Sequence, residues 1–291
     1  MLHTIHNKFL TVTVSELGAE LQSILGSDGT EYLWQGDPAF WAGRSPILFP
    51  VVGRLNGQKY WLDGKEYETG IHGFARKSKF LLEEKEEDRL VFLLTDNEET
   101  YAQYPRKFAL RLIYTLREDT VEMLCQVENR DSRIMYFGIG GHPGFRVPLA
   151  EGIPFEDYRI RFAEKGTPDR QILAPSYLIS GNTEPYPLEN GDTLSLRHNL
   201  FDDDAVVLSG VSRQATLETE KDSHGVTVTY PQMPHLGLWH KPVSEAPYVC
   251  IEPWYTLPAV DGEETVLEER KDMIALQPGC VYDNTMTIRC F

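Results

Sequence analysis

Residues 107–116 read KFALRLIYTL, and hydrophobic side chains recur in this stretch at every second position. Lys107, Arg111 and Thr115 fall on one side of the alternation. The other side is apolar throughout: Phe108, Leu110, Leu112, Tyr114 and Leu116. Successive side chains of an extended chain point to opposite faces of a sheet. The stretch therefore predicts a β-strand with one buried face and one solvated face.

The same alternation recurs along the chain, at residues 10–14, 121–127 and 226–230. Polar, turn-forming clusters separate the alternating runs: GSDG at 26–29, EEKEED at 83–88, LREDT at 116–120 and ENRDS at 128–132. Such short connections favour antiparallel neighbours over crossover helices. Amphipathic helical runs are scarce, and a single helical turn is expected near residues 37–41. We therefore predict an all-β sandwich or barrel, formed as one domain over residues 1–291.

The chain of 291 residues is strongly acidic, with a formal net charge of −16 and a pI of about 4.9. A surface of this charge repels phosphate backbones and anionic lipids. We therefore expect neither nucleic acid nor a membrane as a partner. A local cluster of Arg and Lys can still attract a small anion against the overall field, so an anionic substrate stays open.

The N-terminal segment MLHTIHNKFLTVTVSELGAE has no basic stretch followed by an apolar run, so no signal peptide is expected. No segment approaches the roughly 18 apolar residues of a membrane-spanning helix. The four cysteines form no CxxC pair and no zinc spacing: Cys125, Cys250, Cys280 and Cys290. Together these features predict a cytoplasmic protein in a reducing compartment.

The glycine-rich segment GIGGHPGFRVPL, residues 138–149, surrounds His142. It nearly matches the GxGxxG pattern of dinucleotide-binding loops, but Pro143 occupies the last glycine position. A phosphate-binding loop also needs a helix N-terminus directly after the glycines, whereas FRVPL is extended and apolar. Two interpretations remain: a tight strand connection with an incidental histidine, or a backbone that presents His142 and lets a substrate approach closely.

Three further stretches place polar side chains within apolar sequence: Arg54 in VVGRLNG, His72 in IHGFAR and Glu252 in CIEPW. A charged side chain in such surroundings is costly unless it is paired or faces a cleft. Burial would raise the pKa of Glu252 and suit it to act as a general base near neutral pH. Structural interpretations also exist, with Arg54 bonded to backbone carbonyls and Glu252 at a sheet edge facing water.

The segment LGLWHKP, residues 236–242, presents Trp239 and Lys241 before a proline. An exposed tryptophan offers a stacking surface for a sugar, and Lys241 can meet a hydroxyl or an anionic group. The alternative is a core tryptophan beside a solvated lysine.

A metal site is a further possibility, because His72, His142 and Glu252 match the two-histidine, one-carboxylate set that binds iron or zinc. These residues are separated by 70 and 110 positions, and no two of them form a local metal motif such as HxH. The sequence therefore favours a site without a metal.

In their order along the chain, Arg54 in VVGRLNG, His72 in IHGFAR, His142 in GGHPGF and Glu252 in CIEPW resemble the motifs of the aldose 1-epimerase (galactose mutarotase) superfamily. The segments EYLWQGDPAFW and WHKP are similar to its bacterial LacX-like branch. The resemblance spans nearly the whole chain. It implies a large antiparallel β-sandwich with the active site in a cleft across one sheet, and neither a metal nor an organic cofactor.

The resemblance also implies a reaction, the interconversion of the α and β anomers of an aldohexose. Glu252 matches the base that takes the proton of the anomeric O1 hydroxyl, and His142 matches the acid that protonates the ring oxygen O5. The C1–O5 bond opens, C1 rotates, and the ring closes on the other face. His72 matches a second active-site histidine, and Arg54 matches an arginine that contacts sugar hydroxyls.

Elementary chemistry agrees with this assignment, since a hemiacetal opens when one proton is removed and another is delivered. An ionised Glu252 beside His142 would raise the pKa of the imidazole and keep it a competent proton donor.

The chain departs from the better-studied galactose mutarotases at two positions. Gly141 precedes His142 and Gly53 precedes Arg54, where those enzymes have asparagine. Their substrate-binding aspartate corresponds here to Asp203 or Asp204.

Three functions follow for a small-molecule sugar as partner. The first is mutarotation of a free aldohexose, with Trp239 and Lys241 among the substrate-binding residues. The second is mutarotation of a hexose phosphate whose phosphate is held by Arg54, Arg76 and Lys241. The third is a sugar-binding module without turnover. A monomer or a homodimer is expected.

Overall fold

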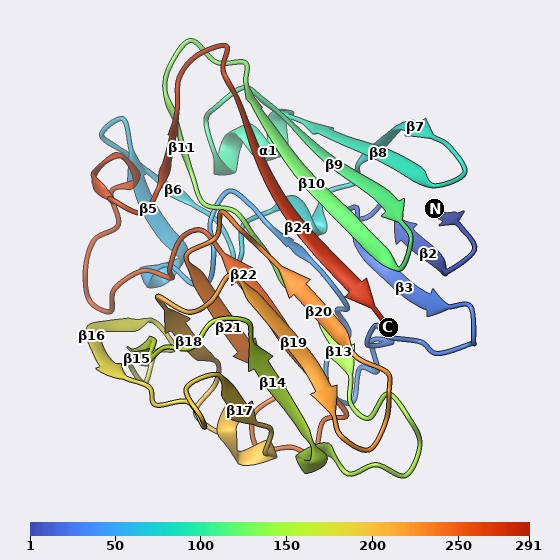
Figure 1. Cartoon of the computed structure of the whole chain (residues 1–291). Helices are drawn as coiled ribbons and strands as arrows, with labels where there is room; N and C mark the ends of the chain where they lie inside the picture. The colour runs from blue at the N-terminus through green and yellow to red at the C-terminus, as the bar shows by residue number, and fades with distance from the viewer.

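The computed structural model describes residues 1–291 and consists almost entirely of antiparallel β-structure (Figure 1). Two large sheets dominate and enclose a core cluster of 66 buried residues. This architecture confirms the predicted all-β class and the antiparallel sandwich. The only α-helix is α1 (Glu98–Gln103), and no helix has the length and apolar character needed to span a membrane.

The first large sheet has nine strands, and the longest of them run side by side in Figure 1. Their order across the sheet is β17 (Thr193–Ser195), β14 (Tyr158–Phe162), β19 (Gln214–Thr219), β20 (Val226–Thr229), β24 (Val281–Cys290), β10 (Thr120–Asn129), β9 (Phe108–Arg117), β8 (Arg89–Thr95) and β7 (Leu81–Lys85).

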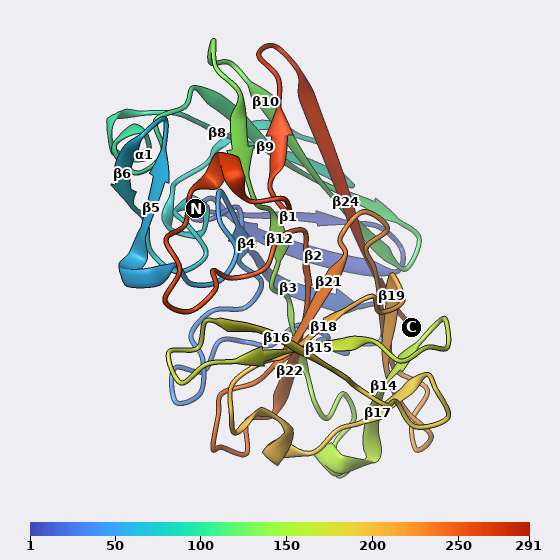
Figure 2. The ribbon, with the colours of Figure 1, turned by 90° about the vertical axis from the view of Figure 1, so that its left-hand side faces the viewer.

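The second large sheet has eight strands and carries the functional candidates; Figure 2 gives a second view of its strands. Its order is β16 (Ile179–Pro185), β15 (Asp169–Leu173), β18 (Val206–Ser209), β21 (His235–Trp239), β22 (Tyr248–Trp254), β12 (Gly140–Gly141) and β4 (Ile47–Leu48), with β13 (Gly144–Arg146) also paired to β22.

Smaller elements complete the fold. Three sheets contain β1 (Leu2–His6), β2 (Leu10–Ser15) and β3 (Leu21–Gly26); β5 (Lys59–Leu62) and β6 (Lys65–Glu68); and β11 (Met135–Phe137) and β23 (Ile274–Leu276). Five short 3₁₀ turns occur at Asn56–Gln58, Ala75–Lys77, Phe155–Asp157, His198–Phe201 and Leu267–Glu269. The turn expected near residues 37–41 forms, since the amides of Phe40 and Trp41 both donate to the Asp37 carbonyl.

The alternating stretch of residues 107–116 forms β9, and its predicted apolar face is buried. The LREDT turn connects β9 to β10, which pairs with it in antiparallel register from Thr120 opposite Arg117 to Asn129 opposite Phe108. The acidic segment at 83–88 was expected to be a loop, but only part of it is one. Residues 83–85 belong to strand β7, and Glu83 is held by the Arg111 guanidinium on β9. Arg111, two strands away in the same sheet, thus offsets the charge of Glu83 where the acidic run joins the sheet as its edge strand.

Gly73 ties the loop after β6 to β4 and helps to position the neighbouring His72. It has a φ of +70°, and a Cβ added there would lie 2.2 Å from the carbonyl oxygen of Phe49. The amides of Phe74 and Ala75 donate to the same carbonyl. The backbones therefore approach too closely for any side chain at this position.

We expect Gly73→Ala to lower the free energy of unfolding by about 2–5 kcal/mol, from left-handed strain plus a backbone clash. Gly64→Ala is the matched control, because its φ is +68° but nothing lies within 4 Å of the added Cβ. That variant should lose only about 1–2 kcal/mol. Urea denaturation of both variants tests this, and equal losses would contradict the clash.

Candidate active site

Strand β22 provides the floor of the candidate site. All seven of its residues are buried, and alternation along the strand places Cys250, Glu252 and Trp254 on one face. Glu252 is 2% exposed, which is rare for a carboxylate without a partner. The alternative interpretation of Glu252 as a carboxylate at a sheet edge facing water is therefore wrong.

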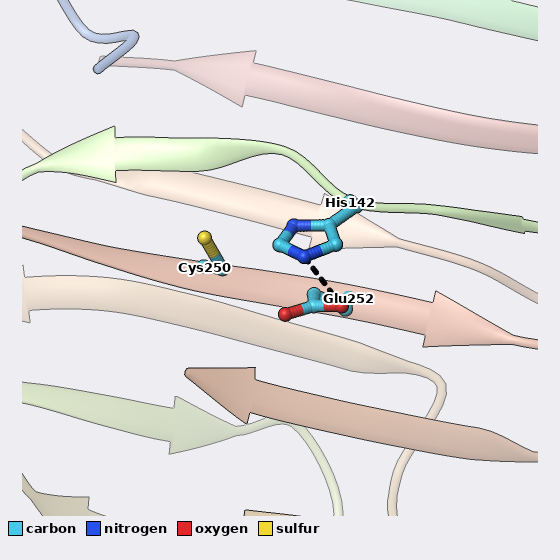
Figure 3. A group of neighbouring side chains, drawn as sticks. All are labelled: His142, Cys250 and Glu252. Atoms are coloured by element: carbon cyan, nitrogen blue, oxygen red, sulfur yellow. Dashed lines mark ion pairs between the residues drawn. The ribbon is translucent and has the colours of Figure 1, made fainter. Parts of the chain in front are cut away.

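The register of the neighbouring strands brings His142 to this carboxylate. Gly140 of β12 pairs with Trp254, and Gly144 of β13 pairs with Cys250. His142, midway between the two glycines, therefore lies opposite Glu252, which is midway between Cys250 and Trp254. Its Nε2 is 3.2 Å from a Glu252 carboxylate oxygen, as Figure 3 shows. Residues 110 positions apart thus meet as a cross-strand pair.

The glycines around His142 have a packing function. A Cβ on Gly141 would lie 3.0 Å from the Met286 methyl group on the nine-stranded sheet, and one on Gly140 would lie 2.9 Å from the Pro253 carbonyl oxygen. The segment therefore needs glycine to fit between strand β22 and the opposite sheet. This differs from the expectation that the glycines make room for a substrate.

His142 and Glu252 open onto a cavity of about 180 Å³ on the face of the eight-stranded sheet. The other polar or aromatic side chains that line it are Trp41, Arg54, His72, Arg76, Tyr177, Asp204, Trp239 and Trp254. The structure thus brings Arg54, His72 and Trp239 to the same cavity as His142 and Glu252. It also places Asp204, and not Asp203, in the cavity wall.

His72 approaches His142 from the loop after β6. It has a left-handed φ of 63°, and its Nδ1 accepts a hydrogen bond from the Gly53 amide at 3.0 Å. The two imidazole rings are in edge contact, with centroids 5.5 Å apart. The Gly53 amide therefore fixes which nitrogen of His72 carries a proton, since Nδ1 has to accept.

Two tryptophans enclose the His142 ring. Trp41 stacks on its face at a centroid distance of 4.8 Å, and Trp239 contacts it edge-on at 5.8 Å. Trp41 was not among the predicted site residues, although its segment EYLWQGDPAFW had been noted for family resemblance. Its contact with His142 depends on the path of the loop after β3, which periodicity does not reveal.

The structure does not bring Lys241 to the cavity. Its Nζ donates to the Ala39 carbonyl at 2.8 Å, two residues before Trp41. The Trp34 indole donates to the Trp41 carbonyl, also at 2.8 Å. Lys241 and Trp34 therefore anchor the loop that carries Trp41.

Comparison with known proteins supports what this geometry suggests. The sequence matches the aldose 1-epimerase family over residues 1–289. The chain belongs to the aldose 1-epimerase family. It is 36% identical over 286 residues to the plasmid-encoded protein LacX of Lactococcus lactis subsp. lactis, covering 94% of this chain and 93% of LacX.

Solved structures agree with the family assignment. A galactose mutarotase related enzyme from Lactobacillus acidophilus is 34% identical, with a TM-score of 0.95 over 100% of this chain and 97% of its own. A galactose mutarotase-like protein from Lactobacillus casei is 31% identical, with a TM-score of 0.95 and full coverage of both chains. The fold extends to a galactose mutarotase-like protein from Clostridium acetobutylicum, with a TM-score of 0.79, 19% identity, and coverage of 100% of this chain and 95% of that one.

In this aldose 1-epimerase family member, two arginines at the cavity have no acidic partner. Neither Arg54 nor Arg76 makes a side-chain hydrogen bond or an ion pair within the chain, and the buried Nε of Arg76 has no partner at all. The Arg54 guanidinium lies 5.5 Å from the centre of the Tyr177 ring. In a chain of net charge −16, two guanidinium groups without a direct ion pair thus lie at one cavity, whose wall also contains Asp204 and Glu252.

Burial dominates the electrostatics of the His142–Glu252 pair. It lowers the pKa of His142 to about 3 and raises the pKa of Glu252 well above its ordinary value. The negative charge of Asp204 adds to the rise at Glu252, and the positive charge of Arg76 adds to the fall at His142. The expected rise in the pKa of His142 is therefore wrong, because both members of the pair are desolvated together.

The two-histidine, one-carboxylate set is not the group that the fold assembles. Burial, with the charges of His142 and the two cavity arginines, lowers the pKa of His72 well below its usual value, and its Nδ1 is occupied by the Gly53 amide. Instead, the ligand-type atoms of His142, Cys250 and Glu252 lie within 4.8 Å of one another.

We expect NMR titration of the histidine side chains to show no protonation of His142 between about pH 5 and pH 8, since burial depresses its pKa. His224 is the internal reference. Hydrogen bonds from its ring to Asp28 and then Asp222 raise its pKa above 6.5. A His142 midpoint at or above that of His224 would contradict the dominance of burial.

Proposed function

We propose that this chain is an aldose 1-epimerase that interconverts the α and β anomers of an aldohexose. The observation that carries the proposal is the buried contact of His142 Nε2 with the Glu252 carboxylate at 3.2 Å, at the floor of a cavity lined by tryptophan and arginine. A base and an acid side by side are what hemiacetal opening requires.

In the proposed reaction the sugar enters so that its O1 hydroxyl meets Glu252 and its ring oxygen O5 meets His142. Glu252 takes the O1 proton, the C1–O5 bond breaks, and His142 gives a proton to O5. The product is the open-chain aldehyde with a new C1=O1 bond. After C1 rotates, O5 attacks the other face of the carbonyl, His142 recovers its proton and Glu252 returns one to O1.

This pair suits a proton exchange with no net change of charge. Burial favours the neutral arrangement, a carboxylic acid facing a neutral imidazole. Moving one proton from Glu252 to His142 produces the carboxylate and imidazolium that the reaction uses. The sugar oxygens, which replace part of the lost hydration, are therefore assigned the role of stabilising the charged arrangement.

The remaining cavity residues are assigned to substrate positioning. Arg54, His72 and Asp204 face the cavity with hydrogen-bonding groups suited to sugar hydroxyls. Trp239 and Trp41 offer apolar surfaces against which a pyranose ring can pack. Lys241 is assigned to the Trp41 loop instead of the sugar.

Polarimetry on freshly dissolved α-D-glucose and α-D-galactose tests the proposal. We expect Glu252→Gln and His142→Asn each to lower the rate by about 10²- to 10⁴-fold, the contribution of one positioned acid or base. His6→Asn and Glu87→Gln are matched controls, because these residues form an exposed pair 3.6 Å apart. Both controls should keep wild-type rates.

Sugar binding is to be measured on the same variants by calorimetry. Retained binding with lost turnover supports the acid and base roles. If the wild-type chain binds free and phosphorylated sugars but accelerates mutarotation of none, the chain is instead a sugar-binding module.

A hexose phosphate is the second candidate substrate, favoured by the two guanidinium groups without acidic partners. Arg76 also lacks any hydrogen-bond partner at its buried Nε, so a bound anion would satisfy a group that the protein leaves free. An arginine presents paired donors that match phosphate oxygens.

If the substrate is phosphorylated, Arg76→Met should raise KM for a hexose 6-phosphate by about 10- to 100-fold, the loss of one charge-assisted contact. KM for the free hexose should change much less. Arg146→Met is the control, since Arg146 is exposed and lies outside the cavity. Equal effects of Arg76→Met on both substrates would assign the arginine to general sugar binding.

A further inference from the structure

We propose that His142, Cys250 and Glu252 form a binding site for Zn²⁺, and that Zn²⁺ bound there excludes the sugar and inhibits the enzyme. The zinc ion has no part in the reaction proposed above, although two of its three ligands are the acid and base assigned there. The inhibition rests on that proposed function, whereas the binding of Zn²⁺ does not.

The sheet places the three ligands together. Cys250 and Glu252 are two residues apart on β22 and therefore share a face, while His142 lies across from Glu252 on the adjacent segment. Their ligand atoms lie within 4.8 Å of one another, and the imidazole-to-carboxylate contact is already 3.2 Å (Figure 3). In tetrahedral zinc sites, bonds of about 2.0–2.3 Å put neighbouring ligand atoms about 3.3–3.8 Å apart. Side-chain rotation has to close the remaining distance.

The chemistry of the donor set selects the ion. One nitrogen, one sulfur and one oxygen donor suit zinc, whereas calcium and magnesium prefer oxygen alone. A thiolate and a carboxylate carry two negative charges, which balance Zn²⁺ when the imidazole is neutral. The buried site therefore becomes neutral overall, and this removes much of the cost of an ion away from water.

Cys250 has no hydrogen-bond partner within the chain that would compete with a zinc ion for its sulfur. Its thiol makes no hydrogen bond and lies in a small cluster of buried residues with Trp34, Ala246 and Tyr248. Metal binding deprotonates it, so the thiol gives up a proton to solvent as Zn–S forms.

Competition with the sugar follows from the position of the ion. Three protein ligands leave the fourth zinc position open toward the cavity, where water can complete the tetrahedron. The ion replaces the proton shared by His142 and Glu252, so neither side chain is free to exchange protons with a sugar. Zinc is therefore expected to raise KM without a change in kcat.

The test uses the full chain and Zn²⁺ alone, with Mg²⁺ as the negative ion control. Calorimetry should show one Zn²⁺ bound per chain and no Mg²⁺. Cys250→Ser should weaken Zn²⁺ binding by at least about 10-fold, the lower limit of losses seen when only supporting groups of a metal site are removed. Cys125→Ser, a buried cysteine on β10, should bind as wild type.

Spectroscopy with Co²⁺ gives a readout that does not need activity. The wild-type chain should show a thiolate-to-cobalt charge-transfer band, and Cys250→Ser should not. Glu252→Gln provides a second variant with weakened binding if Cys250→Ser is unstable, and thermal melting distinguishes the two causes.

In the mutarotation assay, Zn²⁺ should inhibit the wild type competitively, a chelator should restore the rate, and Cys250→Ser should keep its basal rate while resisting zinc. Binding that depends on Cys250 in a chain without mutarotase activity would overturn the proposed function and leave the zinc site standing. Equal zinc binding by wild type and Cys250→Ser, activation by zinc, or no zinc binding would overturn the inference.

Discussion

The antiparallel register of β12 and β13 against β22 is the constraint on which the site depends. Gly140 opposite Trp254 and Gly144 opposite Cys250 leave one possible partner for His142, which is Glu252. A slip of one residue would turn His142 to the other face of the sheet. The glycines maintain this register, because larger residues would collide with β22 or with Met286 of the facing sheet. The same small residues thus control packing between the sheets and the geometry of the pair.

Burial of the His142–Glu252 pair makes the stability of the folded chain depend on pH. The unfolded chain takes up a proton on the imidazole near its usual pKa of about 6.5, whereas the folded chain resists protonation of His142. Stability contributed by the neutral group is therefore present above that pH and is lost as the pH falls below it. Glu252 affects stability in the opposite direction. Its pKa is raised in the folded chain, so folding favours the protonated carboxyl group. The stability that this group contributes is present below its ordinary pKa and is lost as the pH rises above that value. The two groups therefore affect stability with opposite dependence on pH.

Periodicity predicts the strands that have one buried and one solvated face, as the alternation from Phe108 to Leu116 illustrates, whereas β22 is buried on both faces. His72, Arg54 and Glu252 can also be found from the sequence, because burying a polar or charged side chain without a partner costs free energy. Local sequence does not reveal which loop covers His142, so it neither places Trp41 at the site nor shows that Lys241 lies outside the cavity. The sequence predicts a raised pKa for His142 for a related reason. The charge of a partner can be read from the sequence, but the loss of solvent shared by both groups is a property of the folded site.

Cys250 illustrates how one strand face combines separate demands. A residue two positions before Glu252 points to the same side of the strand, so its side chain lies beside the His142–Glu252 pair whatever its chemistry. A valine there would fill the same space among Trp34, Ala246 and Tyr248 without binding a metal. A thiol adds a third donor to a nitrogen and an oxygen that the fold already holds 3.2 Å apart. The closeness of His142 and Glu252 on which the proposed proton exchange rests is therefore also the basis of the proposed zinc site.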